Sequence, residues 1–302
     1  MIRRDTSSAL DALIASLFDY AGMFPPASLS FDDALRESLS FAEALQRPWM
    51  VGADLVLDME HTRLLADKAD SFPLGFGRPV RVCLLASAPL DKVAEFAEEA
   101  RARISSLLSL VSIEAKVSPE TGPEAVALLG RFCATSGALL ALEPDLSVRD
   151  WELSLAAAAR TASAAAFPVA IKCRCTGPAA IGPERLARAI AVAADARLPF
   201  KVTGGFHHPV VEPGIHEYPM GFLNLAAAVL LRRALGERAA ERQLARLLAN
   251  DSIGEIGLAD DLSFGELSIS AAQARSARDM AHFSVGSCSI SEPDRDLLRL
   301  LR

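Results

Sequence analysis

The stretch FPVAIKCRCTGPAAIGPERLARAIAVAADARLPFKVTGG, residues 167–205, contains the pattern that decides the fold. Two apolar runs, at 167–175 and 199–203, read as strands, and the segment 183–196 between them reads as a helix. Near-continuous apolar strands that alternate with helices are typical of a parallel sheet covered on both faces. The stretch therefore predicts one strand–helix–strand unit of an α/β protein.

The same alternation extends over most of the chain. Six strand–helix units run from residue 53 to residue 235, and segments near 19–24 and 283–286 supply two more strands. Eight units predict a closed (β/α)8 TIM-type barrel, as a single domain over residues 1–302 with an irregular insertion around 250–270. The alternative is an open doubly wound parallel sheet, although the Gly-x-Gly-x-x-Gly fingerprint of that fold is absent. The other expected strands are 53–58, 80–85, 110–117 and 138–143, and the other expected helices are 89–105, 122–136 and 148–166.

Composition excludes several classes of function. The formal net charge of the 302 residues is −7 and no Lys/Arg block stands out, which argues against a nucleic-acid binder. The most apolar segment, 223–231, is cut short by Arg232 and Arg233, so no membrane span is expected. Five scattered cysteines and no secretory signal indicate reduced thiols in a cytoplasmic protein. The expected partner is a small anionic metabolite, and a homo-oligomer is compatible with this composition.

Two lysines lie inside consecutive predicted strands. Strand alternation places Lys172 and Arg174 on one face, and Lys201 stands in the next strand. A single lysine in a strand is usually an edge residue whose amine reaches water. Three cations that converge in one barrel, however, require an anionic ligand or nearby carboxylates, because such groups are rarely buried without partners. The carboxylates expected at or near strand ends are Asp58, Glu114 and Glu143.

Further polar residues follow the same two strands. The N–H groups of paired glycines can cradle a phosphate or a carboxylate, although paired glycines also mark ordinary turns. An asparagine at the start of the next helix either caps that helix or contacts substrate. The expected substrate-binding residues are Glu143, Arg174, Thr176, Thr203, Gly204, Gly205 and Asn224.

The adjacent histidines His207 and His208 support two interpretations. Each is a candidate for proton transfer, and each could instead be a loop residue bonded to backbone. The alternative is a divalent metal site, in which His216 returns as a partner and residues at other strand ends contribute. Those further contributors would be Asp58, His61 and Glu143. Cys288, between two serines after Gly286, is a candidate thiol nucleophile.

The two lysine-containing strands resemble a known family, and this resemblance indicates one type of reaction. Lysine followed by Thr-Gly on a late strand, and lysine followed by Thr-Gly-Gly on the next, resembles the class I aldolases of the deoxyribose-phosphate aldolase type over residues 171–205. The resemblance implies that Lys172 forms a Schiff base, that Lys201 lowers its pKa, and that Gly204 and Gly205 hold phosphate. Arg174 and the two histidines depart from that family's pattern.

A second resemblance spans nearly the whole chain. The sequence is similar to a bacterial family to which no reaction is assigned, through KxRC, KxTxGxHHP, GFLN, GSCSxxEP and an early DYAGMFPPA segment. These motifs stand at 172–175, 201–209, 221–224, 286–293 and 19–27. The family implies no activity.

Together these features predict a barrel enzyme that acts on a small anionic carbonyl or sugar-phosphate-like compound. The preferred chemistry is that of a Schiff-base aldolase or lyase at Lys172 with Lys201, His207 and His208 also catalytic, and it needs no cofactor. The second hypothesis is a metal-dependent hydrolase or isomerase that uses the histidines and a divalent metal ion. The third is a non-catalytic protein that binds an anionic metabolite.

Overall fold

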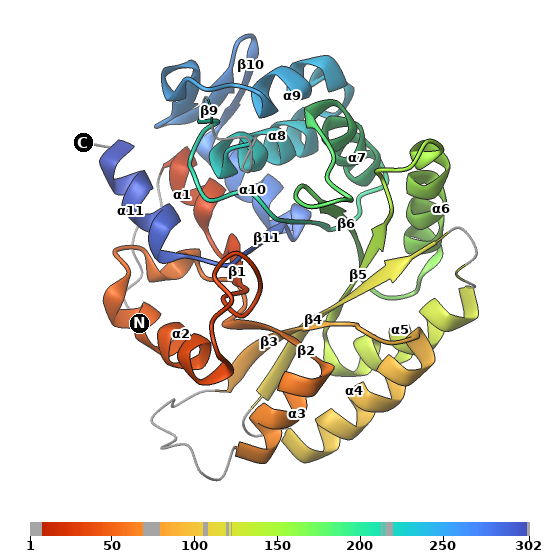
Figure 1. Cartoon of the computed structure of the whole chain (residues 1–302). Helices are drawn as coiled ribbons and strands as arrows, with labels where there is room; N and C mark the ends of the chain where they lie inside the picture. Colours follow the sequence, from red (N-terminus) through yellow and green to blue (C-terminus); the bar gives the residue numbers. More distant parts are fainter. Residues whose placement is uncertain are drawn as a thin grey trace.

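The computed structural model describes residues 8–68, 79–104, 108–118, 121, 123–212, 214 and 220–300. Within these residues, eight parallel strands form one sheet in the order β1-β11-β7-β6-β5-β4-β3-β2 (Figure 1). The strands are β1 (Phe18–Tyr20), β2 (Leu55–Asp58), β3 (Val80–Leu85), β4 (Leu108–Val117), β5 (Leu139–Pro144), β6 (Val169–Arg174), β7 (Phe200–Thr203) and β11 (Ser284–Ser287).

The two ends of this strand order meet. Phe18 of β1 pairs with Val51, just before β2, and the Tyr20 N–H donates to the Ala53 carbonyl at 3.1 Å. The Gly52 N–H also donates to the Phe18 carbonyl, at 2.6 Å. These bonds make the sheet a nearly closed (β/α)8 barrel in a single domain, which confirms the predicted fold and excludes the open doubly wound alternative.

Helices surround the barrel (Figure 1). They are α1 (Ala9–Ile14), α2 (Phe31–Ala44), α3 (Met59–Lys68), α4 (Leu90–Ile104), α5 (Pro123–Ser136), α6 (Trp151–Ala164), α7 (Pro183–Asp195), α8 (Phe222–Leu235), α9 (Glu241–Leu248), α10 (Ala271–Ala281) and α11 (Ser291–Leu300). Each predicted strand and helix between residues 80 and 203 has its counterpart, with ends that differ by a few residues at most. The short segments near 19–24 and 283–286 supply β1 and β11, as expected.

The region predicted as an irregular insertion holds regular structure. A separate antiparallel sheet, in the order β10-β9-β8, is formed by β8 (Ile256–Leu258), β9 (Asp261–Phe264) and β10 (Leu267–Ser270). Strands β9 and β10 contact α8, and so do α1, α7, α9 and α10. Helix α8 is apolar around nearly its whole circumference. This composition suits a helix that other strands and helices cover on the side that faces away from the barrel.

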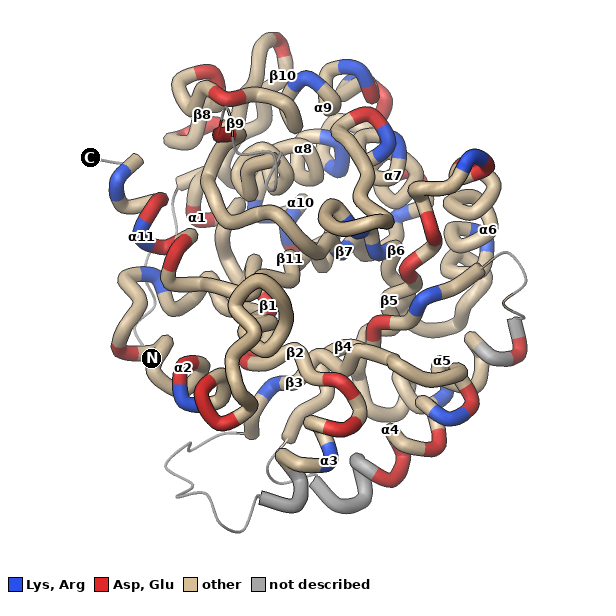
Figure 2. Tube along the Cα trace, in the orientation of Figure 1, with Lys and Arg blue, Asp and Glu red and all other residues tan. Residues whose placement is uncertain are grey.

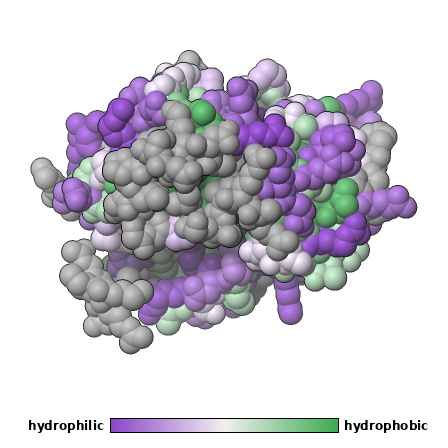
Figure 3. All heavy atoms as spheres, turned by 90° about the horizontal axis from the view of Figure 1, so that it is seen from below, coloured by the Kyte–Doolittle hydropathy of each residue, from purple (hydrophilic) through white to green (hydrophobic). Residues whose placement is uncertain are grey.

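The described exterior is mostly polar on the face drawn in Figure 3. The apolar areas of this face are separated by polar ones. Among the described residues, no helix combines the length and the apolar character needed to cross a membrane.

Candidate functional site

Lys172 and Lys201 lie side by side near the carboxyl ends of β6 and β7. The two residues are paired in register, and each side chain is 1% exposed. Lys201 contacts Glu114 of β4 and Asp19 of β1, and neither of these strands is a neighbour of β7 in the sheet. Both amines therefore point into the barrel interior, as strand alternation predicted.

Carboxylates from three other strands meet these amines. Glu114 of β4 lies between them, with Oε2 2.5 Å from the Lys172 Nζ and Oε1 2.7 Å from the Lys201 Nζ. Glu143 of β5 places Oε2 2.5 Å from the Lys172 Nζ, and Asp19 of β1 places Oδ2 2.5 Å from the Lys201 Nζ. Figure 2 shows Lys or Arg positions in blue on β6 and β7, and Asp or Glu positions in red on other strands of the barrel.

Arg174 completes the group from the end of β6. Its Nε donates to Glu143 Oε1 at 2.7 Å, and a terminal nitrogen donates to Oε2 at 3.1 Å. Three cations and three carboxylates thus form one network with zero formal charge, in which charges that are expensive to bury alone offset one another. The interior ion network is Asp19, Glu114, Glu143, Lys172, Arg174 and Lys201.

Burial and pairing shift the titration of these groups in opposite directions. Burial raises the pKa of Glu114, but Lys172 and Lys201 outweigh it and hold that pKa well below its usual range. Burial likewise raises the pKa of Glu143, and Lys172 with Arg174 brings it below its usual value. For Lys201, burial lowers the pKa, whereas Asp19 and Glu114 raise it well above the ordinary value. At neutral pH the carboxylates Glu114 and Glu143 are ionised and Lys201 carries its proton.

Arg174 links the network to solvent. Its side chain is 30% exposed, and a cavity of about 100 Å³ adjoins it at the carboxyl ends of β4, β5 and β6. The charged residues that line this cavity are Lys116, Glu143, Asp145 and Arg174. The cavity has room for a few heavy atoms next to the Glu143–Arg174 pair, so a small anion there would compete with Glu143 for the guanidinium.

The glycines after β7 adopt backbone conformations that other residues avoid. Gly204 and Gly205 have φ angles of +85° and +87°. A Cβ on Gly204 would lie 2.0 Å from the Thr176 Oγ1, so the loops after β6 and β7 touch here. Thr203, the last residue of β7, pairs with Arg174. Their proposed contact with substrate stays a prediction.

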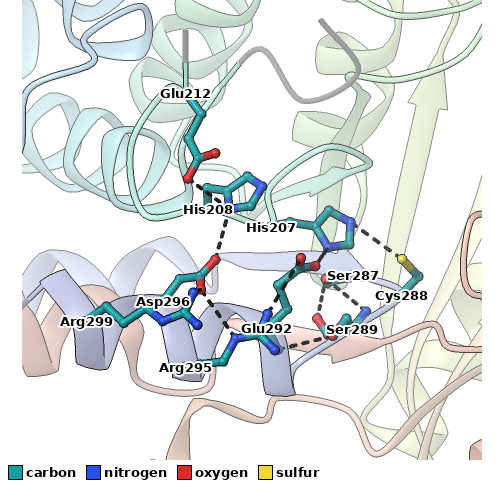
Figure 4. Close-up of polar contacts among 10 residues, drawn as sticks. All are labelled: His207, His208, Glu212, Ser287, Cys288, Ser289, Glu292, Arg295, Asp296 and Arg299. Atoms are coloured by element: carbon teal, nitrogen blue, oxygen red, sulfur yellow. Dashed lines mark hydrogen bonds and ion pairs between the residues drawn. The ribbon is translucent and has the colours of Figure 1, made fainter. Parts of the chain in front are cut away.

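The histidines lie against helix α11 (Figure 4). His207 Nδ1 is 2.9 Å from the Glu292 Oε2, and its Nε2 is 3.5 Å from the Cys288 Sγ. His208 Nδ1 is 3.0 Å from an Asp296 carboxylate oxygen. Carboxylates of α11 therefore orient both rings.

The residues of the alternative metal site do not come together in the described part of the chain. Asp58 pairs with His61, Nδ1 to Oδ1 at 2.8 Å, at the start of α3. His216 lies outside the described residues. Among those that are described, no group of three or more His, Cys, Asp or Glu side chains is arranged to hold a metal ion.

Asn224 occupies a different environment from the one expected. It is fully buried in α8, and its amide donates to the Leu247 carbonyl at 2.7 Å and to the Asn250 carbonyl at 2.9 Å. Through these two hydrogen bonds, Asn224 holds α8 against the end of α9.

Sequence reasoning missed two members of the interior. Asp19 stands in a predicted strand and in the DYAGMFPPA motif but was not predicted as a site residue, although a charged residue inside the apolar run Leu17–Tyr20 is the same signal that singled out the lysines. Cys83 of β3 lies 3.1 Å from Glu114 Oε1 and 3.4 Å from the Lys201 Nζ. Burial raises the pKa of Cys83, so this thiol stays protonated within the network.

Comparison with known proteins supports the fold. Deoxyribose phosphate aldolase from Aeropyrum pernix, whose structure is described as a unique tetramer, matches 99% of this chain and 100% of its own with a TM-score of 0.53 and 14% identity. UMP synthase from Leishmania donovani matches 80% of this chain and 54% of its own, with a TM-score of 0.44 and 18% identity. No protein-family model and no curated protein sequence matches the chain. At this identity the first likeness shows a shared barrel.

Proposed function

We propose that this barrel is a Schiff-base enzyme, an aldolase or another carbon–carbon lyase, that uses Lys172 on a small anionic carbonyl compound such as a sugar phosphate. The observation that carries the proposal is Glu114, whose carboxylate bridges two buried amines in register, each two residues before the carboxyl end of its strand. Active sites of (β/α)8 barrels lie at this end of the strands.

The two lysines take different roles. Lys201 stays charged because Asp19 and Glu114 raise its pKa. Nucleophilic attack on a carbonyl requires a neutral amine, which Lys201 does not offer. Lys172 is therefore the nucleophile and Lys201 the fixed cation.

Substrate binding supplies the route by which Lys172 loses its proton. An anionic substrate that binds Arg174 draws the guanidinium from Glu143, and so removes one of the groups that hold the pKa of this carboxyl down. Glu143 then accepts a proton from Lys172, a transfer within the network that leaves its total charge unchanged. The free amine adds to the carbonyl carbon, and Glu143 returns its proton as water leaves. The iminium then accepts the electron pair of the carbon–carbon bond that breaks, while Glu143 takes the hydroxyl proton of the fragment that departs as an aldehyde. Glu143 gives this proton to the enamine carbon, which regenerates the iminium. Hydrolysis restores Lys172.

Reductive trapping tests this function. The chain has five lysines, so adducts are few and easily assigned. Borohydride is added to the protein with acetaldehyde, pyruvate or glyceraldehyde phosphate, and the intact mass is recorded. We expect one carbonyl-dependent adduct that Lys172→Met abolishes. Lys92→Met, which replaces an exposed lysine on α4, is the matched control and should leave it in place. A folded wild type with no adduct from any carbonyl compound contradicts the proposal.

One observation favours the non-catalytic alternative. The interior cations already have carboxylate partners, so the network needs no ligand for charge balance, and of its three cations Arg174 alone lines the cavity. A barrel that merely binds an anionic metabolite would be thermally stabilised by phosphate or phosphoglycolate and would convert no carbonyl compound. Product formation from any of the trapped compounds excludes it.

We also infer a homo-oligomer in a reducing compartment. The Aeropyrum pernix aldolase is a tetramer, and all five cysteines of this chain are free and buried. Free thiols are typical of cytoplasmic proteins. Light scattering of the purified protein gives its oligomeric state directly, and a monomeric mass contradicts the first part of this inference.

A further inference from the structure

A thiol, an imidazole and a carboxylate line up outside the interior ion network (Figure 4). Cys288 directly follows β11, and His207 lies in the loop after the neighbouring strand β7. The Cys288 Sγ is 3.5 Å from His207 Nε2, and His207 Nδ1 is 2.9 Å from Glu292 Oε2 in the first turn of α11. The three groups come from two segments, the loop after β7 and the stretch 288–292, which the pairing of β7 with β11 brings together.

The order of the contacts sets the tautomer of His207. An ionised carboxylate only accepts hydrogen bonds, so the Nδ1 of His207 donates to Glu292. In the neutral ring Nε2 is then an acceptor, and it faces the Cys288 thiol. A base held by a third group, with its free nitrogen toward a nucleophile, is the arrangement that activates serine and cysteine nucleophiles.

The protonation states agree with this arrangement. Burial lowers the pKa of His207, although Glu292 opposes that effect, so the ring is neutral at pH 7 and able to accept a proton. Burial raises the pKa of Cys288, so the resting group is a thiol. Backbone N–H groups of Ala27 and of Cys288 itself act in the opposite direction on this sulfur and favour its charged form.

Local hydrogen bonds fix Cys288 between two serines. The Ser287 Oγ donates to the Ser289 carbonyl at 2.6 Å and lies 3.4 Å from the Ser289 nitrogen. The Glu292 N–H donates to the Ser289 Oγ at 3.2 Å, which ties α11 to the same turn. Nucleophile and orienting carboxylate are thus held by one short, bonded segment.

Cys288 is also the most accessible thiol of the chain. Its residue is 9% exposed, whereas the other four cysteines are almost fully buried. The motif around it, GSCSxxEP, contains both Cys288 and Glu292, and the KxTxGxHHP motif contains His207. The interior ion network uses none of these three residues.

We propose that Cys288, His207 and Glu292 form a second reactive centre, in which the thiol attacks the acyl carbon of an ester or thioester. His207 Nε2 takes the thiol proton as the sulfur–carbon bond forms, and passes it to the leaving alkoxide or thiolate as the bond from the acyl carbon to that group breaks. Water then attacks the acyl-enzyme with His207 again as base, which releases a carboxylic acid and restores the thiol. Glu292 is a positioning residue that acts through His207.

Acylation of the full-length protein tests this proposal without reference to the Schiff base. The protein is mixed with p-nitrophenyl acetate or S-acetyl-N-acetylcysteamine, and acetylated peptides are followed by mass spectrometry. We expect Cys288 to be acetylated first, and His207→Asn to slow its acetylation roughly 100-fold or more, the range that a general base contributes. His282→Asn is the matched control, because His282 is exposed and its φ of +40° suits asparagine, and it should leave the rate unchanged.

A pH profile separates positioning from a structural role. The groups that face His207 are Glu292 of α11, Cys288 after β11 and His208 of its own loop. Glu292 raises the pKa of His207, so Glu292→Gln should shift the acidic limb of the acetylation rate to lower pH. Unreactive Cys288 in a folded wild type, or a Cys288 rate that His207→Asn leaves intact, overturns the proposal. If the acidic limb of the pH profile of Glu292→Gln coincides with that of the wild type, Glu292 does not act through His207.

Discussion

Replacing Glu114 with glutamine removes the one carboxylate that touches both buried lysines. The amide keeps the shape but not the charge, and it leaves two ammonium groups side by side in a network with a net charge of +1. Breaking a buried ion pair on one side costs about 3–5 kcal/mol of unfolding free energy. At about 2 °C per kcal/mol for a chain of this size, Tm should fall by roughly 6–10 °C.

The pH dependence identifies the cause of that loss. Because the pKa of Glu114 is lowered on folding, its contribution is fully present above the unfolded value of 4.5 and is lost as pH falls through the folded value. The difference between wild type and Glu114→Gln should therefore be constant from about pH 6 to 8 and shrink as the pH drops below 4.5. Urea unfolding across this range measures it, with the exposed Glu152→Gln as control, which should shift stability by less than about 0.5 kcal/mol. Two results would contradict this expectation: equal unfolding free energies of wild type and Glu114→Gln at neutral pH, or a difference between them that does not change with pH.

Three further substitutions have defined outcomes. Gly204→Ala should cost at least about 1–3 kcal/mol in urea unfolding, because alanine is strained at φ +85° and its Cβ meets Thr176; a neutral effect contradicts that geometry. Arg174→Met should weaken the binding of a small anionic carbonyl compound by about 10- to 100-fold in calorimetry, since hydrogen bonds to a charged partner are worth about 1.5–3 kcal/mol; unchanged binding would place the substrate elsewhere. Asn224→Ala should lower stability by about 1–3 kcal/mol, because two buried carbonyls lose their donor; an equally stable variant would show that these bonds contribute nothing.

The fold was predictable because its signal is local. Each strand is a short apolar run and each helix a dozen or so residues with its own periodicity, so the eightfold alternation can be read window by window. The antiparallel sheet at 256–270 lies outside this alternation, and the sequence predicted only an irregular insertion there. The burial of α8 over residues 222–232 depends on this sheet together with α1, α7, α9 and α10, whereas the sequence shows only that α8 is apolar.

The site was predictable only in part, because its partners are distant in sequence. Strand alternation placed Lys172, Arg174 and Lys201 on inward faces, but the partner of Lys201 is Asp19, 182 residues away. The same limit applies to His207, whose partner Glu292 lies 85 residues further along the chain in α11. The adjacent histidines were predicted as proton-transfer or metal-binding residues, whereas the pairing of β7 with β11 brings His207 next to Cys288. The residue types in the sequence predict which side chains are chemically reactive. Which of these side chains contact one another depends on the closure of the barrel.

The identity of the buried lysine that forms the covalent bond is central to the proposed mechanism. Wild-type protein reduced with borohydride in the presence of the trapping carbonyl compound, digested and mapped peptide by peptide, answers this directly. Lys172 should carry the adduct while Lys201 stays unmodified, because Asp19 and Glu114 keep the Lys201 amine charged. An adduct on Lys201, or one spread over the exposed lysines, would contradict the assignment of Lys172 as the nucleophile.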